Sequence, residues 1–535
     1  MTKNFIVLKG GVEVSIFIVV LAIYILITAF LGYLGYKHTK SSMDYMVAGG
    51  DIHPYVMGMA YGATFISTSA IVGFGGAAGF YGMSMLWLTF ANIFVGIFIA
   101  FVFFGKKTRT LGQKHSAYTF PHLLGAHFQS TFIRKWSAAL MSLVLPLYAA
   151  AVMIGGARFL EQTLQMNYST ALWVLSLIVL AYVFFGGLRG VVYTDAFQGT
   201  LMFVMMFLLL CFTYIKLGGI SVAHAKLNAM TSLVPAALAK QGMTGFASMP
   251  IFLSQNWWFV ISTLVLGVGI GVLAQPQLVV RYMTVKSGKE LNRALVFGGV
   301  FILFMTGVAF TIGALSNVYF HETSNTIAMT ASAIGGTGPN TDKVIPLFLS
   351  QAFPAWLVYF FLLGLLAAAM STLSGLFHII STSISYDLFG KTSKDDSSKT
   401  LLLARAGLIV GFIATVMVAN ILPGNIIAVA TSIFFGLCAA AFLPIYAGSL
   451  WWPRATRTGA TWSMLVGTCV YSFMCLFVYT KESAIFGLAK AIFGNSSLAG
   501  TGSLSYVDPL IIALPASIIV FIIVSLLTKP LSVSV

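Results

Sequence analysis

Charged side chains are scarce in this chain, and that scarcity excludes several classes of protein. Aspartate and glutamate together number 13 in 535 residues, and charged residues of both signs make up only 8%. No two carboxylates lie together within an apolar run, the histidines form no metal-ligand array, and there is no His-Glu-x-x-His motif. An intramembrane hydrolase or metalloenzyme therefore has no visible catalytic residues.

Cysteine is scarce as well. The four cysteines all lie in apolar runs without metal-ligand spacing: Cys211, Cys438, Cys469 and Cys475. We interpret them as small hydrophobic residues that form neither a disulfide framework nor a redox site.

Apolar residues, in contrast, make up 59% of the chain, and the mean hydropathy is +0.95. This composition predicts an all-α polytopic membrane protein that forms one domain over residues 1–535. Runs of about 20 apolar residues are long enough to cross a bilayer. Thirteen such spans are predicted, near residues 11–36, 54–80, 83–105, 131–164, 170–187, 193–216, 250–280, 291–316, 354–388, 401–421, 425–449, 459–480 and 508–528. The first run is too long for a signal-peptide core, so we expect it to remain as a span.

The distribution of basic residues predicts the orientation of the chain. If the N-terminus lies outside and the C-terminus in the cytoplasm, 20 of the 29 lysines and arginines fall in cytoplasmic loops, Arg281 among them. The long loops at about 217–249, 317–353 and 481–507 then lie outside. The acidic inner leaflet of a cell (inner) membrane accounts for the net charge of +16, so no nucleic-acid partner is needed. Nothing in the sequence predicts an oligomeric state.

One apolar stretch, residues 62–82, combines five glycines in its second half with the hydroxyl triplet Ser67, Thr68 and Ser69. Glycine costs roughly 1 kcal/mol relative to alanine inside a helix, so this stretch favours an interrupted helix. Interrupted helices in membranes free carbonyl oxygens, which often bind ions or substrates. The same composition is also typical of helices that pack closely through small residues.

A weak internal symmetry appears once the first helix, 11–36, is set aside. Five spans after the glycine-rich stretch comes Gly267-Val-Gly-Ile-Gly271, which predicts a second interrupted helix. We therefore predict an inverted repeat, with repeat one over 54–216, repeat two over 250–449 and peripheral helices over 459–528.

A second polar cluster lies within the span 354–388. Ala368, Ser371 and Thr372 stand at positions i, i+3 and i+4, so they share one helix face. Two hydroxyls and a carbonyl, set against carbonyls freed by a broken helix, would form an oxygen cage without formal charge. Such a cage suits a hard monovalent cation, because divalent ions normally demand carboxylates. The alternative is that both hydroxyls bond back to their own helix.

Four motifs in this order carry a resemblance to a known family. They are Gly186-Gly-Leu-Arg-Gly-Val-Val-Tyr-Thr-Asp195-Ala-Phe-Gln198, Gln275-Pro276 with Arg281, Ala368-x-x-Ser371-Thr372, and Phe442-x-Pro444 continuing to Gly459-Ala460. The chain resembles the sodium:solute symporter family. That resemblance implies the inverted-repeat fold of the sodium-coupled leucine transporter. It also implies Na⁺ as coupling ion, bound by the carbonyls of Ala63, Ile66 and Ala368 and the hydroxyls of Ser371 and Thr372.

Departures from the family pattern narrow the choice of transported solute. Sugar carriers place a glutamine at the position of Ala70 and a tyrosine at that of Gly271, and proline carriers place an aspartate at that of Phe65. The run Ile154–Glu161 is similar to that of pantothenate carriers. We expect a small organic carboxylate, such as pantothenate or a short monocarboxylate, with a proline-type amino acid as the alternative. The residues expected to contact the solute are Ser67, Thr68, Ser69, Ala70, Arg158 and Gly271.

Several assignments stay open on the sequence alone. Arg158 either attracts a substrate carboxylate or pairs with Glu161. The resemblance implies a second Na⁺ at Asp195 and Ser374, although Gly375 replaces an expected serine; alternatively, Asp195 caps its helix or pairs with Arg189 or another cytoplasmic base. His378 is predicted either to modulate the coupling of solute uptake from the cytoplasmic half of the pathway, or simply to be packed between helices. Two less favoured functions are a channel and a transporter-like sensor. A channel would need a continuous polar pore, but the sequence shows only one polar cluster, at the break. A transporter-like sensor would need an appended signalling domain.

Overall fold

The computed structural model describes residues 11–38, 42–164, 166–333, 338–389, 397–423, 425–500 and 502–530. Within these ranges all regular secondary structure is helical. The longest helices are dominated by apolar residues. They are α1 (Gly11–His38), α8 (Thr131–Leu164), α9 (Tyr168–Lys216), α15 (Gly288–Ser324), α18 (Ala355–Thr382), α19 (Ser397–Ile421), α20 (Ile427–Trp451), α21 (Arg457–Phe473) and α24 (Leu510–Leu527).

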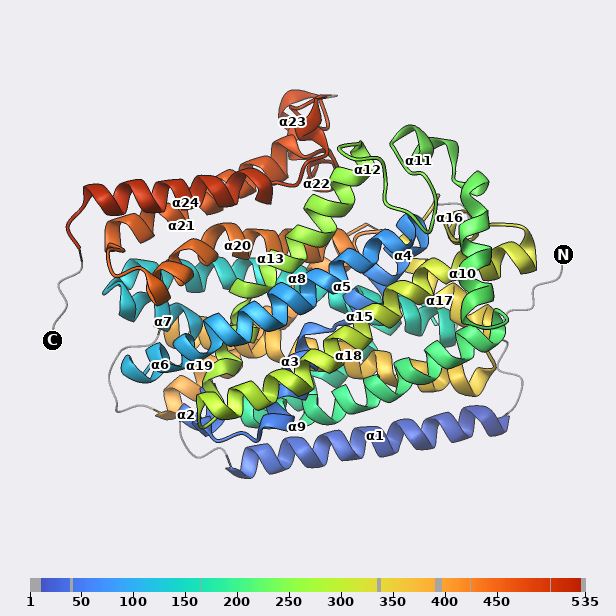
Figure 1. Cartoon of the computed structure of the whole chain (residues 1–535). Coiled ribbons are helices and arrows are strands. Elements are labelled where there is room, and N and C mark those ends of the chain that lie inside the picture. The colour runs from blue at the N-terminus through green and yellow to red at the C-terminus, as the bar shows by residue number, and fades with distance from the viewer. Residues whose placement is uncertain are drawn as a thin grey trace.

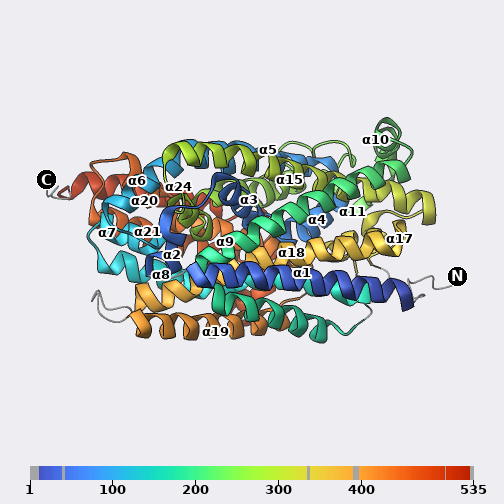
Figure 2. The ribbon, with the colours of Figure 1, turned by 90° about the horizontal axis from the view of Figure 1, so that it is seen from below.

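The long helices lie side by side in one bundle. α1 packs on α9 along one edge of the bundle, and α24 packs on α21 along the opposite edge (Figure 1). Seen from below, α1 crosses the face of the bundle and α19 follows its lower border (Figure 2). Large apolar side chains on these outer helices, such as Leu26, Leu402 and Leu527, are exposed, as contact with lipid tails requires.

Eleven helical stretches of the described residues are long and apolar enough to cross a membrane, so the predicted count of thirteen is not confirmed. One reason is that the stretch Ser69–Lys114 joins parts of two predicted spans without a gap. Another is that α9 continues through Gly186–Gly190, where the sequence predicted a connection between 170–187 and 193–216. The apolar part before that point, Tyr168–Leu180, is shorter than a full span.

The predicted interruption of the stretch 62–82 is present, and it falls at the hydroxyl triplet rather than at the glycines. α3 (Pro54–Phe65) ends where Ile66 turns to an extended conformation, with φ −85° and ψ 92°. After Ser67 and Thr68 the chain is helical again without a gap. The segments are η2 (Ser69–Phe74, π-helical), α4 (Gly75–Tyr81), η3 (Gly82–Met85), α5 (Leu86–Ile93), η4 (Phe94–Gly105, π-helical) and α6 (Lys106–Lys114).

The glycines of this stretch instead allow close packing, which is the other role that the sequence left open. A Cβ atom on Gly76 in α4 would lie 1.9 Å from the carbonyl oxygen of Thr341 in α17 (Thr341–Ala352). No side chain fits there, so α4 and α17 meet backbone to backbone.

The second interruption exists, but its predicted position at Gly267–Gly271 is wrong. The helical segments are α12 (Gln255–Trp258), η6 (Phe259–Gly267, π-helical), α13 (Val268–Gly271), η7 (Val272–Ala274), α14 (Pro276–Val279) and η8 (Val280–Met283). Gly267 and Gly271 keep helical φ values of −52° and −55°, and the break occurs at Gln275, with ψ 115°. The reason is Pro276, because a proline ring forces the preceding residue out of the helical region.

Short helices close the two ends of the bundle. At one end, the predicted long outer loops contain α10 (Ile220–Ala229), η5 (Met230–Leu233), α11 (Ala236–Lys240), α16 (Ala328–Ser332), α17, α22 (Thr480–Phe486), α23 (Leu488–Phe493) and η11 (Ser503–Ser505). The other end carries α2 (Ser42–Val47), η1 (Ala48–Gly50), α6 and α7 (Phe120–His127) (Figure 1). Two π-helical segments, η9 (Ser383–Leu388) and η10 (Met474–Val478), extend α18 and α21.

Candidate functional site

The break after α3 leaves the carbonyls of its last turn without partners in their own helix. Only the carbonyl of Gly62 is satisfied locally, by the amide of Ile66 at 2.8 Å. The next carbonyls turn toward α18, whose side chains are buried from Phe361 to Thr382. The broken end of α3 therefore faces the innermost helix of the bundle.

Two hydroxyls of α18 donate hydrogen bonds to these carbonyls. Ser371 Oγ donates to the carbonyl of Ala63 at 2.9 Å and lies 3.2 Å from the carbonyl of Ala368. Thr372 Oγ1 donates to the carbonyl of Thr64 at 3.1 Å. The structure thus brings together the oxygens of Ala63, Ala368 and Ser371 and sets Thr372 beside them.

Ile66 is the residue at which α3 ends, so all five predicted sodium-site residues lie on the break or on the α18 face that meets it. The five oxygens belong to buried residues and carry no formal charge. Rotation of a hydroxyl about its C–O bond turns a lone pair toward a cation that the carbonyls also contact. Chemically, the arrangement can hold a hard monovalent cation.

The hydroxyl triplet divides into two bonded members and one without a partner. Thr68 Oγ1 donates to the carbonyl of Val152 in α8 at 2.6 Å. Ser67 Oγ accepts from the Tyr148 hydroxyl at 3.4 Å, and Ser69 Oγ is buried with no hydrogen-bond partner in the described part of the chain. The partly exposed Ala70 follows directly. Among the described residues, Ser69 is therefore the member of the triplet whose hydroxyl is left without a partner.

Gly271, the other residue expected to contact the solute, lies against α20. A Cβ atom there would come 2.6 Å from the carbonyl oxygen of Phe435, so this position accepts only glycine at the observed spacing. Its own carbonyl accepts from Gln275 Nε2 at 3.2 Å, which ties the second break to the helix that precedes it.

Asp195 lies in the middle of α9 and is completely buried. One carboxylate oxygen accepts from Arg281 at 2.6 Å and from the Thr64 hydroxyl at 3.0 Å. The other accepts from Ser374 at 3.2 Å. Asp195 and Ser374, the predicted ligands of a second Na⁺, thus lie in contact with each other, and the base that pairs with Asp195 is Arg281. Arg189 instead pairs with Asp51 at 2.5 Å.

The sequence placed Arg281 among the bases of the cytoplasmic loops, and that assignment is wrong. Its side chain is 1% exposed, in η8, and it donates to both Asp195 and the Thr64 hydroxyl. A buried guanidinium needs a carboxylate partner, because an unpaired charge costs several kcal/mol. The signal for this pair was the presence of both residues in the family motifs, but 86 residues separate them and spacing alone could not join them.

Two further residues are placed in the roles that the sequence gave as alternatives. Arg158 Nη1 pairs with Glu161 at 2.9 Å, and its guanidinium lies over the ring of Tyr168, 4.1 Å from the centroid. His378 is 2% exposed, with its ring 5.3 Å from that of Tyr45. It is packed between helices.

The fold and this site define the chain as a polytopic α-helical secondary transporter built around broken helices. The sequence profile of the sodium:solute symporter family matches residues 45–467. The chain belongs to this family of symporters and is not an enzyme.

Relatives and solved structures agree with this assignment. The chain is 26% identical to the sodium/proline symporter of Salmonella typhimurium, over 84% of this chain and 86% of the relative. It is 28% identical to the sodium/pantothenate symporter of Haemophilus influenzae, over 86% and 91%. A Na⁺-coupled sialic acid symporter in an outward-open state shares the fold, with a TM-score of 0.73, 19% identity and coverage of 97% and 98%.

Proposed function

We propose that the chain imports a small organic carboxylate together with Na⁺ across a cell membrane by alternating access. The observation that carries this proposal is the meeting of the freed Ala63 carbonyl with Ser371 at 2.9 Å. It places uncharged oxygens from a broken helix and from the central helix around one point. Half-helix ends near the middle of a membrane are the usual binding sites of such transporters.

Na⁺ is the coupling ion that fits these ligands. The oxygens of Ala63, Ile66, Ala368, Ser371 and Thr372 include no carboxylate, which disfavours divalent ions. They also include no imidazole or thiolate, the ligands that transition metals prefer. The relatives are named as sodium symporters, and the same ion is proposed here.

A carboxylate without a neighbouring ammonium group is the solute that we favour. The stretch from Tyr61 to Val72, which contains the break, holds no charged residue, so no carboxylate there can pair with the ammonium of an amino acid. Phe65, at the position where proline carriers place an aspartate, is buried with its ring 6.4 Å from that of Phe435. The pantothenate relative supports this choice.

A proline-type amino acid is the second candidate. Relatives named as sodium/proline symporters match this chain at 26% identity over most of its length. Both candidates carry a carboxylate, so the same hydroxyl-rich break can serve either one. They differ in net charge, which makes them separable by experiment.

Within this proposal the solute contacts the residues at the break. Ser69 offers a hydroxyl without a partner among the described residues and Ala70 a partly exposed methyl group, while Ser67, Thr68 and Gly271 shape the walls. Arg158 attracts the carboxylate on its way in, and for this it must release Glu161, its present partner.

Asp195 and Ser374 form the proposed second Na⁺ site. In the present conformation the Arg281 guanidinium neutralises Asp195, so a second Na⁺ enters only when that guanidinium moves away. The inverted repeat, 54–216 and 250–449, is proposed on the two interruptions, at Ile66–Thr68 and at Gln275. The N-terminus is proposed to lie outside, with the C-terminus in the cytoplasm.

Uptake into proteoliposomes tests the proposal. With an inward Na⁺ gradient, we expect accumulation of radiolabelled pantothenate or a short monocarboxylate, and no accumulation when K⁺ replaces Na⁺. Unlabelled proline serves as the competitor that distinguishes the second candidate. Na⁺-independent uptake, or no uptake of any carboxylate or amino acid, would contradict the proposal.

A further inference from the structure

Two carboxylates that the transport mechanism does not use lie buried where α22, α24 and η6 meet. Glu482 in α22 and Asp508, just before α24, are both 0% exposed. They are close enough to interact electrostatically with each other, as well as with the hydroxyls of Tyr471 and Tyr479. Within the described residues, no ion pair with a basic side chain is found for either carboxylate.

The oxygens of this cluster lack partners to an unusual degree. Among the described residues, both oxygens of Glu482, Oδ2 of Asp508 and the Tyr471 hydroxyl find no nitrogen or oxygen partner, although all four are buried. The thiol of Cys475, a weak donor, is the polar group beside Glu482. Tyr471 belongs to α21 and is 1% exposed, so it is an unsatisfied group independent of the two acids. An unpaired buried polar group costs about 1–3 kcal/mol, and a buried charge costs more. Four such oxygens at one place point to a bound ligand.

The remaining contacts fix the acids in position. Asp508 Oδ1 caps α24 by accepting from the amide of Leu510 at 2.8 Å, and its own amide donates to Ser262 Oγ in η6 at 3.0 Å. The Thr263 hydroxyl bonds that of Tyr479 at 2.9 Å. Lys481 directly precedes Glu482 in the sequence, but its side chain points elsewhere. Its ammonium lies over the ring of Phe259 and near the Tyr81 hydroxyl.

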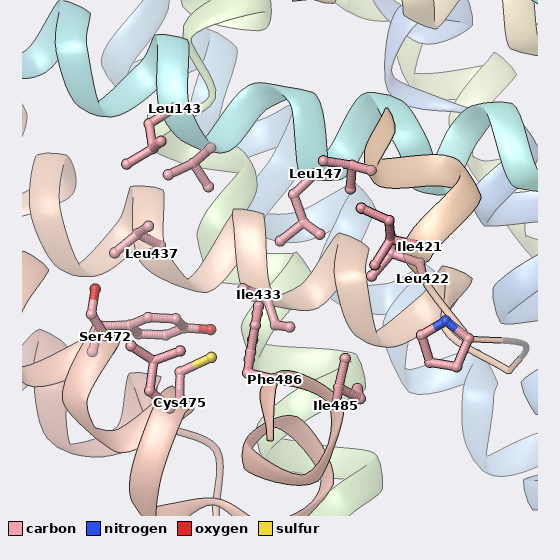
Figure 3. A pocket seen from close by; sticks show the side chains of 15 residues that line it. Leu143, Leu147, Ile421, Leu422, Ile433, Leu437, Ser472, Cys475, Ile485 and Phe486 are labelled. Carbon is pink, nitrogen blue, oxygen red and sulfur yellow. The ribbon is translucent and has the colours of Figure 1, made fainter. Parts of the chain in front are cut away.

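A cavity of about 520 Å³ lies beside the cluster. It is lined almost entirely by apolar side chains of α8, α19, α20 and α22, and Figure 3 shows Cys475 at its edge with Ile433 and Leu437 nearby. Tyr471 and Cys475 also line this cavity, so they separate it from the acids.

We propose that Glu482 and Asp508, with the Tyr471 hydroxyl, bind a hard divalent cation, Ca²⁺ or Mg²⁺, that ties α22 to α24 and η6. Two carboxyl groups without a base supply two negative charges to a divalent ion that displaces their protons, and the unpartnered donors are all oxygens. No three His, Cys, Asp or Glu side chains converge as metal ligands within the described residues, so the other ligands are hydroxyls, carbonyls and water, which Ca²⁺ accepts. The ion is structural and is not transported.

Thermal unfolding of the purified full-length chain in nanodiscs tests this site. After treatment with a chelator, addition of about 1 mM Ca²⁺ should raise the thermal midpoint by several degrees, since sites on outer surfaces bind Ca²⁺ in this range. K⁺ at equal ionic strength should not. E482Q and D508N should abolish the shift and should be more stable than the wild type in chelator, because each replaces a buried carboxyl group that lacks a partner with a neutral amide. Tyr471→Phe should weaken the shift.

Glu322→Gln is the matched control, because Glu322 lies in the exposed ion pair with Lys226 and should leave the Ca²⁺ shift intact. Tb³⁺ luminescence gives a second readout on the wild type alone: emission sensitised by Tyr471 and displaced by Ca²⁺ is expected. No shift with Ca²⁺ or Mg²⁺ and no displaceable Tb³⁺ signal would overturn the proposal. A midpoint that responds only to pH would also overturn it, because protons would then neutralise the pair. Neither readout involves solute or Na⁺, so these experiments test the divalent-cation site independently of the transport proposal.

Discussion

Single hydroxyls of Ser371 and Thr372 hold the broken end of α3, and both should matter for Na⁺. Replacing either residue with alanine removes one coordinating oxygen from a buried cation. A lost charge-assisted contact is worth about 1.5–3 kcal/mol, so the Na⁺ concentration for half-maximal uptake should rise by roughly tenfold or more. Na⁺ titration of uptake in proteoliposomes measures the change.

Thr382→Ala is the control for this pair, because Thr382 is also buried in α18 but bonds only to carbonyls of its own helix. Its Na⁺ dependence should match that of the wild type. Unchanged Na⁺ dependence in both S371A and T372A, with normal amounts of protein, would show that these hydroxyls do not bind the ion.

The meeting of the broken end of α3 with the hydroxyl face of α18 could be predicted from two short-range facts: a polar triplet within a glycine-rich apolar stretch, and three oxygens on one helix face. The ion pair of Asp195 with Arg281 could not, because it joins residues 86 positions apart and depends on the path of η8 into the bundle. Burial of an arginine is a tertiary property, and positive charge near a span end usually indicates a cytoplasmic loop.

At the scale of elements, the contact between α4 and α17 sets the packing at one end of the bundle. Gly76→Ala would place a methyl group 1.9 Å from the Thr341 carbonyl oxygen, so the two helices must separate. Overpacking of this kind costs about 1–3 kcal/mol, and both the thermal midpoint and the transport rate should fall.

Gly307→Ala in α15 is the matched control for Gly76→Ala. The nearest atom to a Cβ at Gly307 is 4.0 Å away, on Thr89, so the methyl group has space there. Alanine is the better helix former, and this variant should be neutral or slightly more stable. Equal midpoints for the two variants would mean that α4 can shift without penalty.

The two interruptions show which part of an element a sequence can predict. That each helix breaks could be predicted from composition, but the positions at Ile66 and Gln275 could not be predicted from glycine content. In the stretch 62–82 the glycines let two helices pack closely. In the second interruption, Pro276 forces the preceding residue, Gln275, out of the helical region. The energetic cost of glycine in a helix is small enough for packing to override it.

At the scale of the whole molecule, the number of Na⁺ ions fixes the net charge moved in each cycle. A tenfold Na⁺ gradient supplies about 1.4 kcal/mol per ion, and a potential of 100 mV adds about 2.3 kcal/mol per net charge. One Na⁺ with a monoanion carries no charge and permits only about tenfold accumulation. Two Na⁺ supply about 5 kcal/mol, or several thousandfold. With the proposed site at Asp195 and Ser374, uptake of a monoanion should produce an inward current.

Solid-supported-membrane recordings detect that current. Asp195→Asn should reduce it relative to uptake, and Ser381→Ala, which loses a bond to the Ala404 carbonyl and a contact with Tyr45 away from Asp195, should not. Transport of an anion without any current under a negative potential would mean one Na⁺, and Asp195 would then be a structural partner of Arg281.

Acid should destabilise the fold through two histidines of α7. Burial lowers the pKa of His122 to about 4, helped by the charge of Arg134, and burial likewise lowers the pKa of His127 to about 4, helped by His115. In the unfolded chain both titrate near 6.5. Between those values the unfolded state binds more protons, so this contribution to stability is complete above about pH 6.5 and is lost as the pH falls toward 4.

The variant H122Q/H127Q should therefore lose less thermal stability than the wild type between pH 7 and pH 5. His321→Gln, at the far end of α15, is the control and should follow the wild type. Carboxylates with raised pKa values act in the opposite sense: burial raises the pKa of Asp342 to about 6, and its protonation favours the fold at low pH. The comparison of variants isolates the histidines, and parallel pH curves for all three proteins would refute the assignment.

Thr64 touches both proposed cation sites with different atoms. Its carbonyl accepts from Thr372, while its hydroxyl donates to Asp195 and accepts from Arg281. A cation that draws the carbonyl of Thr64 toward the first site must also move the hydroxyl that steadies the ion pair at the second. By thermodynamic linkage the effect is reciprocal, so release of Arg281 from Asp195 changes the affinity of the first site by the same factor. One threonine can thus make the two sites cooperative without any further moving part.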